Sequence, residues 1–270
     1  MNRTFSPLDE YIHMRDGVSA WSGGDRVLFV VAHILNWRTA LDTHAQHCAT
    51  HSCEWIASWP PPEGANVRAL VTDSADDCRM RFYHHSSFLH MRGLALLQQK
   101  MGDDGWYDWY DWYVFVDDNT RVVGGNWTHM STPLQLSPRA IPMYAGDFAD
   151  QGHSEFACGG GGFLLSNAAF RRVNFSQCIE SCSRHAHPQS VGLDHIMQRC
   201  MVRHNIQPKK QLSCGTCGNR WSPKFTAKRV RSGECSFMHM QRSHSPSRYA
   251  ALVKSSSPHR ALLVHRHAEL

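Results

Sequence analysis

The chain has 270 residues, of which 42% are hydrophobic, so it can bury a substantial core in one large domain. Its formal net charge of +5 is mild, and its basic residues are scattered apart from one loose group: Lys209, Lys210, Lys228, Arg229 and Arg231. This distribution argues against a dedicated nucleic-acid-binding protein.

The apolar pattern of the first half alternates between strands and helices. Val27–Ile34 is a short β-branched run, typical of a strand that is buried on both faces and opens a parallel sheet. We predict a helix around Arg38–Cys48 and a loop at Trp59–Gly64, where three prolines interrupt the pattern. Val67–Thr72 predicts a second strand.

A longer helix and a third strand follow. Leu89–Gln99 has helical apolar spacing, and Met101–Gly105 ends it with Gly and Asp. Trp112–Val116 predicts a strand that leads directly into Asp117 and Asp118. Alternating strands and helices predict an α/β fold, Rossmann-like with a mostly parallel central sheet, whose ligands bind at the carboxyl ends of the strands.

The second half contains a glycine block, Cys158–Gly162, before an apolar run, Phe163–Ser166, and a helix predicted over Asn167–Val173. The residues after about Ser243 are rich in Ser, Pro, His and Arg and are predicted to be poorly ordered.

We therefore divide the chain into an N-terminal extension (residues 1–24), one domain (25–242) and a tail (243–270). The ten cysteines form an even set, which suits an oxidising lumen better than the cytosol. Asn-x-Ser/Thr patterns at Asn2, Asn126 and Asn174 indicate the same compartment. No long apolar stretch occurs, and the segment Met1–Gly17 lacks the apolar core of a signal peptide.

The acidic pair at the end of the third predicted strand carries the first chemical signal. Carboxylates in this place can hold a divalent cation against a diphosphate, because a hard cation prefers oxygen ligands and neutralises charge on a departing nucleotide. Taken alone, the segment Asp117–Thr120 could equally be a polar turn after a strand.

Five separated motifs between Val27 and His239 together resemble the Fringe-type and core 1 beta-1,3-galactosyltransferase-like enzymes of glycosyltransferase family 31. Arg38–Asp42 is similar to the Arg-x-x-Leu-Asp segment in which the arginine meets the nucleotide, and a guanidinium fork suits phosphate or uracil oxygens. Its alternative is an ordinary helix surface charge. Val71–Asp76 is similar to the Thr-Asp-x-x-Asp turn beside the nucleoside, which implies a nucleotide contact at Asp73.

The third motif, Trp112–Asn119, resembles an apolar strand that ends in three aspartates. The resemblance implies that Asp117 contacts the nucleotide and that Asp118 and Asn119 ligate Mn²⁺ or another divalent cation. Asn119 replaces the third acid and removes one negative charge, although its carbonyl oxygen can still ligate a metal. This departure raises the alternative of a catalytically degenerate member.

The fourth motif is the glycine block with the apolar run that follows it. It resembles Gly-Gly-Ala-Gly-aromatic-x-x-Ser, which implies that Gly160 and Gly161 let the backbone approach the donor sugar. A glycine run by itself would indicate only a flexible loop.

The fifth motif, Val191–Cys200, resembles the family's acidic pair followed by Arg-Cys and implies that Asp194 is the catalytic base. Gln198 stands where the family has Gly, and a helix N-cap is the alternative role for Asp194. Near the C-terminus, His239 is the nearest match to the family's metal-ligating histidine, and His244 is the alternative.

The pair Cys214 and Cys217 has the Cys-x-x-Cys spacing of half a zinc site or of a redox pair. No second closely spaced pair completes a zinc site, so we favour disulfides with Cys200 or Cys235.

The resemblance implies an A-type glycosyltransferase fold and an inverting hexosyltransferase. It would move galactose, N-acetylglucosamine or glucose from a UDP-sugar to a hydroxyl of a glycan or glycoprotein, with a beta-1,3 linkage. Asp194 would deprotonate the acceptor. We expect a Golgi or secretory-pathway lumen and a membrane anchor in the full-length protein. The rivals are a degenerate Fringe-like binding protein and a Cys/His zinc module that contacts nucleic acid.

Overall fold

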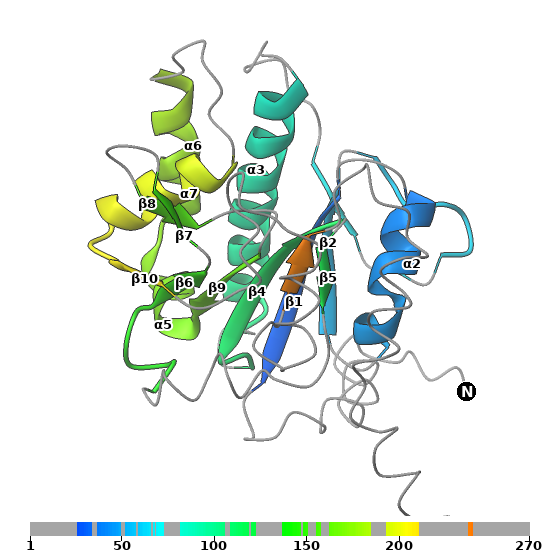
Figure 1. The fold of residues 1–270 in the computed structure, drawn as a ribbon, viewed down its shortest axis with the longest axis horizontal. Helices are drawn as coiled ribbons and strands as arrows, with labels where there is room; N and C mark the ends of the chain where they lie inside the picture. The colour runs from blue at the N-terminus through cyan, green and yellow to red at the C-terminus, as the bar shows by residue number, and fades with distance from the viewer. Residues whose placement is uncertain are drawn as a thin grey trace, which may run out of the picture.

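A computed structural model describes most of the central part of the chain (Figure 1). The described residues are 26–33, 37–49, 52–57, 59–65, 67, 69–72, 82–105, 109–118, 120–122, 137–146, 148–150, 155–157, 162–184, 193–210 and 237–239. The predicted extension and tail lie outside these ranges, so the domain boundaries stay predictions.

A seven-stranded sheet forms the centre of the fold, in the order β10-β6-β9-β4-β1-β2-β3. The strands β1 to β4 run parallel to one another, β6 is parallel to β10, and β9 is antiparallel to its neighbours β4 and β6. The predicted α/β fold with a mostly parallel sheet is confirmed. The strand bounds are β1 Val27–His33, β2 Ser52–Ala57, β3 Ala69–Val71, β4 Trp112–Asp117, β6 Tyr144–Gly146, β9 Phe163–Ser166 and β10 Pro208–Lys210.

Two short antiparallel pairs accompany the central sheet. β5 (Thr120–Val122) pairs with β11 (Phe237–His239), and β7 (Phe148–Asp150) pairs with β8 (Glu155–Ala157). The first pair joins the segment directly after β4 to one from far later in the chain.

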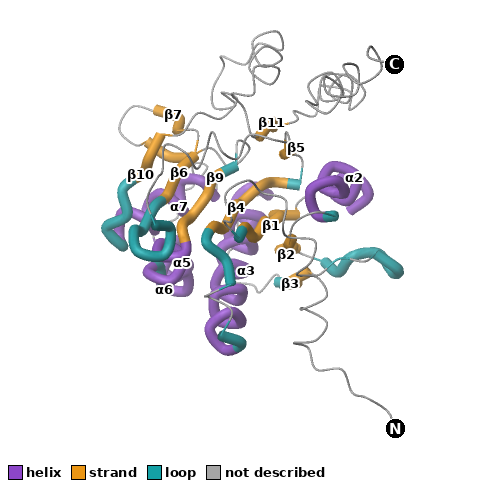
Figure 2. Tube along the Cα trace, turned by 90° about the horizontal axis from the view of Figure 1, so that it is seen from below, coloured by secondary structure: helices purple, strands orange, loops and turns teal. Residues whose placement is uncertain are grey.

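Helices cover both faces of the central sheet, with α2 (Trp37–Cys48) on one side and α3 (Phe82–Asp103) on the other (Figure 2). The period-two alternation of β1 explains this arrangement. Val27, Phe29 and Val31 pack in one buried cluster with residues of α2, whereas Leu28 and Val30 pack in another with residues of α3. The α3 face also carries α5 (Asn167–Arg172), α6 (Phe175–Arg184) and α7 (Leu193–Arg203).

Two disulfides connect neighbouring elements. Cys48–Cys53 joins the end of α2 to β2, and Cys178–Cys200 joins α6 to α7. The prediction that Cys200 pairs within the Cys214 and Cys217 group was wrong, because the packing of α6 against α7 brings Cys178 within 5.4 Å (Cα–Cα) of it. Cys214, Cys217 and Cys235 lie outside the described residues.

No helix in the described ranges is both long and apolar enough to cross a lipid bilayer.

The helix α3 approaches β2 most closely at Gly93. This residue is buried in the helix interior, and a Cβ atom added there would collide with the side chain of Ile56. The contact between α3 and the sheet therefore depends on glycine having no side chain at this position.

We predict that Gly93→Ala destabilises the protein although alanine is the better helix former. The helical gain of up to about 1 kcal/mol is smaller than the overpacking cost of about 1–3 kcal/mol. Gly102, exposed near the end of the same helix, provides the matched control, because Gly102→Ala should keep only the gain. Urea unfolding of both variants gives the comparison, and a stabilised Gly93→Ala protein would show that Ile56 moves aside freely.

Candidate active site

The parallel strands β1 to β4 end at one edge of the sheet, and β4 places acidic residues there. Trp112–Val116 is buried throughout, Asp117 is half-buried and Asp118 is buried. The backbone N–H of Asp118 donates to the carbonyl oxygen of Ala32 at the end of β1, over 3.0 Å. The acidic pair is therefore held by the main chain of the neighbouring strand.

A third carboxylate joins the pair from α7. Burial, together with the negative charges of Asp118 and Asp194, raises the pKa of Asp117 to about 7, and burial is the largest of these causes. Asp194, in the first turn of α7, is therefore near enough for its charge to act on Asp117. A buried strand end whose carboxyl group has a raised pKa is typical of a functional site rather than of a solvated turn.

Asp194 lies inside the first turn of α7, which begins at Leu193. Its Oδ1 atom accepts a hydrogen bond of 3.0 Å from the N–H of His195. An N-cap residue precedes its helix and accepts from an N–H two or three residues on, so this geometry does not match the N-cap alternative. The partial positive charge of a helix N-terminus favours the ionised carboxylate.

His44 of α2 also contacts the acidic strand end, and no sequence motif singled it out. Its ring is fully buried, packs edge-on against Trp55 with centroids 5.4 Å apart, and donates through Nε2 to the carbonyl oxygen of Asp117 over 3.1 Å. The only signal in the sequence is that His44 lies one helical turn after Ala40, on the apolar stripe of its helix. Because α2 carries Arg38, exposed in its first turn, this bond connects the predicted nucleotide helix to the acidic pair.

The end of the glycine block lies at the same edge of the sheet. Since β9 is antiparallel to β4, with Phe163 opposite Phe115, the residue before β9 lies beside the carboxyl end of β4. That residue, Gly162, is buried and has φ of 73°, a left-handed conformation that glycine adopts at little cost.

The final residue of the glycine motif, Ser166, has a structural role. Its hydroxyl oxygen accepts from the N–H groups of Ala169 and Met143 and donates to the carbonyl of Ile141, so it caps α5 and holds the segment before β6.

The pairing of β11 with β5 brings the predicted metal-ligating histidine to this region. The backbone of His239 lies opposite Thr120, two residues after Asp118. Asp73, Asn119, Gly160, Gly161 and His244 lie outside the described residues, so their predicted roles stay predictions.

A small pocket lies beside the acidic end of β4. Apolar side chains from β1, β4 and β9 line it, together with His90 of α3 and Asp117. These apolar surroundings are the physical origin of the burial effect on the carboxyl group of Asp117.

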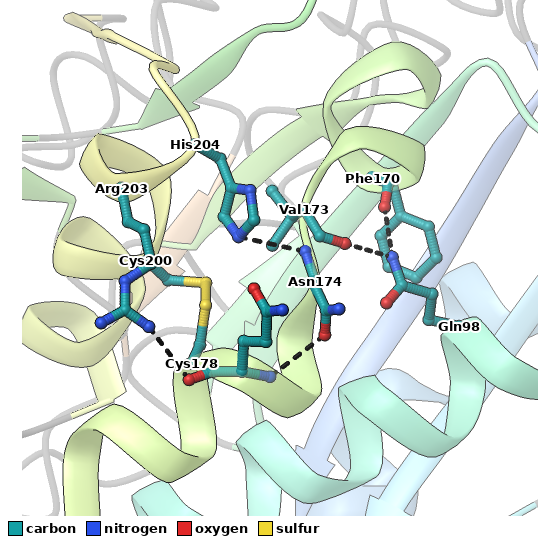
Figure 3. Close-up of a disulfide and its surroundings, with 9 residues drawn as sticks. Gln98, Phe170, Val173, Asn174, Cys178, Cys200, Arg203 and His204 are labelled. Carbon is teal, nitrogen blue, oxygen red and sulfur yellow. Dashed lines mark hydrogen bonds between the residues drawn. A yellow bond between two sulfur atoms is a disulfide. The ribbon is translucent and has the colours of Figure 1, made fainter. Parts of the chain in front are cut away.

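Carboxylate oxygens at this end of the sheet are ligands that Mn²⁺ and Mg²⁺ prefer, and a cation would relieve the repulsion between Asp117 and its acidic neighbours. Asp117, Asp118 and Asp194 do not bring three ligand atoms within 4.8 Å of one another, so these three carboxylates alone do not form a complete cation site. A second group, Cys178, Cys200 and His204, has its ligand atoms within 4.8 Å of one another, but both sulfurs are joined in a disulfide (Figure 3). It therefore does not act as a metal site in this state.

No protein-family model matches the sequence, and no curated protein matches it. Among solved structures, the chain is similar to a glycosyltransferase involved in the glycosylation of the major capsid of PBCV-1. The two share 12% sequence identity with a TM-score of 0.46, over 85% of this chain and 99% of that chain. The function of this chain therefore has to follow from its own residues.

We predict that Mn²⁺ binds more tightly as the pH rises, by up to about tenfold per pH unit below pH 7. Below about pH 7 Asp117 keeps a proton that the cation must displace, and above it the carboxylate is already ionised. Without the cation, the stability of the fold should instead fall as the pH rises from 3.8 towards 7, because the unfolded chain releases this proton first.

Isothermal titration of Mn²⁺ at several pH values measures the first effect. Asp117→Asn keeps every other ionisable group, so its binding should depend less steeply on pH. Equal pH slopes for the two proteins would show that the proton on Asp117 is not coupled to cation binding.

We also predict that His44→Phe weakens cation-dependent nucleotide binding by up to about tenfold, which corresponds to one lost hydrogen bond. Phenylalanine keeps a ring against Trp55 but cannot donate to the Asp117 carbonyl. His44→Gln retains an N–H donor and should recover part of the affinity. UDP titrations with Mn²⁺, alongside melting temperatures, distinguish positioning from global destabilisation, and unchanged affinity in His44→Phe would rule the positioning role out.

Proposed function

We propose that this chain is a glycosyltransferase that moves a sugar from a UDP-sugar to an acceptor hydroxyl. The acidic end of the buried strand β4, where Asp117 and Asp118 lie and where the charge of Asp194 also acts, is the observation that carries the proposal. Ligands of open α/β sheets bind at the carboxyl ends of the strands. Gly162, the last residue of the glycine block, lies beside β4, and the backbone of His239 lies beside β5; both belong to the same end of the sheet and support the proposal.

In the proposed site, Asp118, Asn119 and His239 hold a divalent cation such as Mn²⁺, and Asp117 contacts the nucleotide with Arg38 and Asp73. The bound cation would neutralise negative charge on the departing UDP. The site would have fewer charges than a triple aspartate, because Asn119 contributes a neutral oxygen. Gly160 and Gly161 would leave room for the donor sugar.

The acceptor hydroxyl is deprotonated by Asp194 in this proposal and attacks the anomeric carbon on the face opposite UDP. Attack from that face inverts the anomeric configuration, and the bond to the UDP oxygen breaks as the new glycosidic bond forms. Asp194 suits the role of base, since the N-terminus of α7 favours its ionised form. Asp117, with a pKa of about 7, would hold its proton until a cation binds.

Following the sequence resemblance, we propose that the donor sugar is galactose, N-acetylglucosamine or glucose. The acceptor would be a glycan or glycoprotein, and the new bond a beta-1,3 linkage. The same proposal places the protein in the Golgi or another secretory lumen. The two disulfides of the described region support an oxidising compartment.

A binding protein that kept the fold and lost transfer is the second candidate, favoured by the replacement of an acid with Asn119. Such a protein would bind UDP with Mn²⁺ but leave UDP-sugars intact. A screen of UDP-sugars for transfer and hydrolysis with added Mn²⁺ separates the two functions.

We predict that Asp194→Asn slows sugar transfer by roughly 10² to 10⁴-fold, because a sugar hydroxyl is a poor nucleophile without a base. Asparagine keeps the size of the side chain and an oxygen acceptor for the N–H of His195, so UDP affinity and melting temperature should change little. Asp103→Asn, an exposed position at the end of α3, is the matched control. Near-normal turnover in Asp194→Asn would remove Asp194 from the mechanism.

A further inference from the structure

The start of α6 carries the one Asn-x-Ser/Thr pattern that falls within the described residues: Asn174 directly precedes the helix, and Phe175 and Ser176 are its first two residues. The patterns at Asn2 and Asn126 lie outside the described ranges. Asn174 and Ser176 are exposed, whereas Phe175 between them is fully buried and packs near Phe170, with ring centroids 5.3 Å apart. The buried phenylalanine therefore anchors the segment and leaves both recognition groups, the amide and the hydroxyl, at the surface.

Asn174 is the N-cap of α6, and its contacts leave one atom available (Figure 3). Its Oδ1 accepts from the N–H of Gln177 over 3.1 Å, and its backbone N–H donates to Nε2 of His204 over 3.2 Å. Its carbonyl accepts from the N–H of Cys178 over 3.3 Å. Within the described ranges, no contact engages the amide nitrogen Nδ2.

The surroundings of Asn174 hold its backbone in place. The disulfide Cys178–Cys200 joins α6 to α7, and Arg203 of α7 donates to the carbonyl of Gln177 over 3.2 Å. Burial lowers the pKa of His204, and the charges of Arg203 and Arg172 lower it further, so the ring is neutral and Nε2 accepts the N–H of Asn174. A fixed, exposed amide results.

The helix α6 lies away from the two short strands of the proposed active site, β5 and β11. In both views α6 lies on the α3 side of the sheet, away from β5 and β11 (Figures 1 and 2). A large substituent on Asn174 would extend from this side into solvent.

We propose that Asn174 is an N-glycosylation site. Its Nδ2 forms a bond to the anomeric carbon of an oligosaccharide carried on a lipid pyrophosphate, the lipid pyrophosphate leaves, and Nδ2 releases one proton. The product keeps the carbonyl Oδ1, so the same side chain caps α6 before and after modification. The proposal rests on the proposed passage through a secretory lumen and is independent of sugar transfer by the protein itself.

The test is expression of the full chain behind a cleavable secretion signal in eukaryotic cells. Peptide:N-glycosidase treatment followed by peptide mass spectrometry should find aspartate at position 174, where the glycan was removed. Ser176→Ala keeps the cap and breaks the pattern, and Asn174→Asp keeps an oxygen cap without an amide, so both should lose the glycan at this position. Asn174→Ala should in addition lower the melting temperature by about 2–4 °C, because only this variant removes the cap.

An unmodified Asn174 in protein recovered from the secretory lumen would overturn the proposal, whether or not Asn2 or Asn126 carries a glycan. A glycan that persists in Ser176→Ala would overturn it as well. The Asp194→Asn protein should carry the same glycan as the unaltered chain, so loss of transfer and loss of modification are measured separately.

Discussion

The burial of β4 on both faces and along both edges is the constraint on which the rest of the molecule depends. β1 and β9 occupy its two edges, and apolar side chains of both core clusters cover its faces. The chain can therefore become polar only where β4 ends, and it does so abruptly, with Asp117 and Asp118 directly after Val116. The raised pKa of Asp117 is the direct electrostatic result of this boundary.

Three connections assemble the surrounding elements around this boundary, and each uses a different kind of interaction. A buried histidine bond attaches α2, a disulfide to α6 braces the helix that carries Asp194, and main-chain pairing attaches β11. Like charges that are forced together oppose folding, so the core and the cross-links must offset their repulsion. A bound cation would also offset this repulsion and stabilise the folded state.

Short apolar patterns in the sequence predicted several helices and strands. They did not predict which segments that are distant in the sequence contact one another in the fold. The runs at Val27 and Trp112 are continuous enough to identify β1 and β4, whereas the run at Phe163, which forms β9, was noted without being assigned to a strand. β2 was missed because Glu54, although buried, interrupts its apolar run, and α3 extends beyond its predicted bounds. The three acids were nominated from motif resemblance, whereas their proximity, the bond of His44 and the Cys178–Cys200 pairing depend on three-dimensional packing.

The pairing of β5 with β11 has a consequence for biosynthesis. β5 leaves the ribosome long before β11, so the sheet and its acidic edge can form while the histidine-bearing strand is still being made. Closing so long a loop is entropically costly and slow compared with local helix formation. A nascent chain that ends before β11 would therefore possess the folded scaffold without this strand, and the histidine would join the acidic end of the sheet only after residues 237–239 have been made.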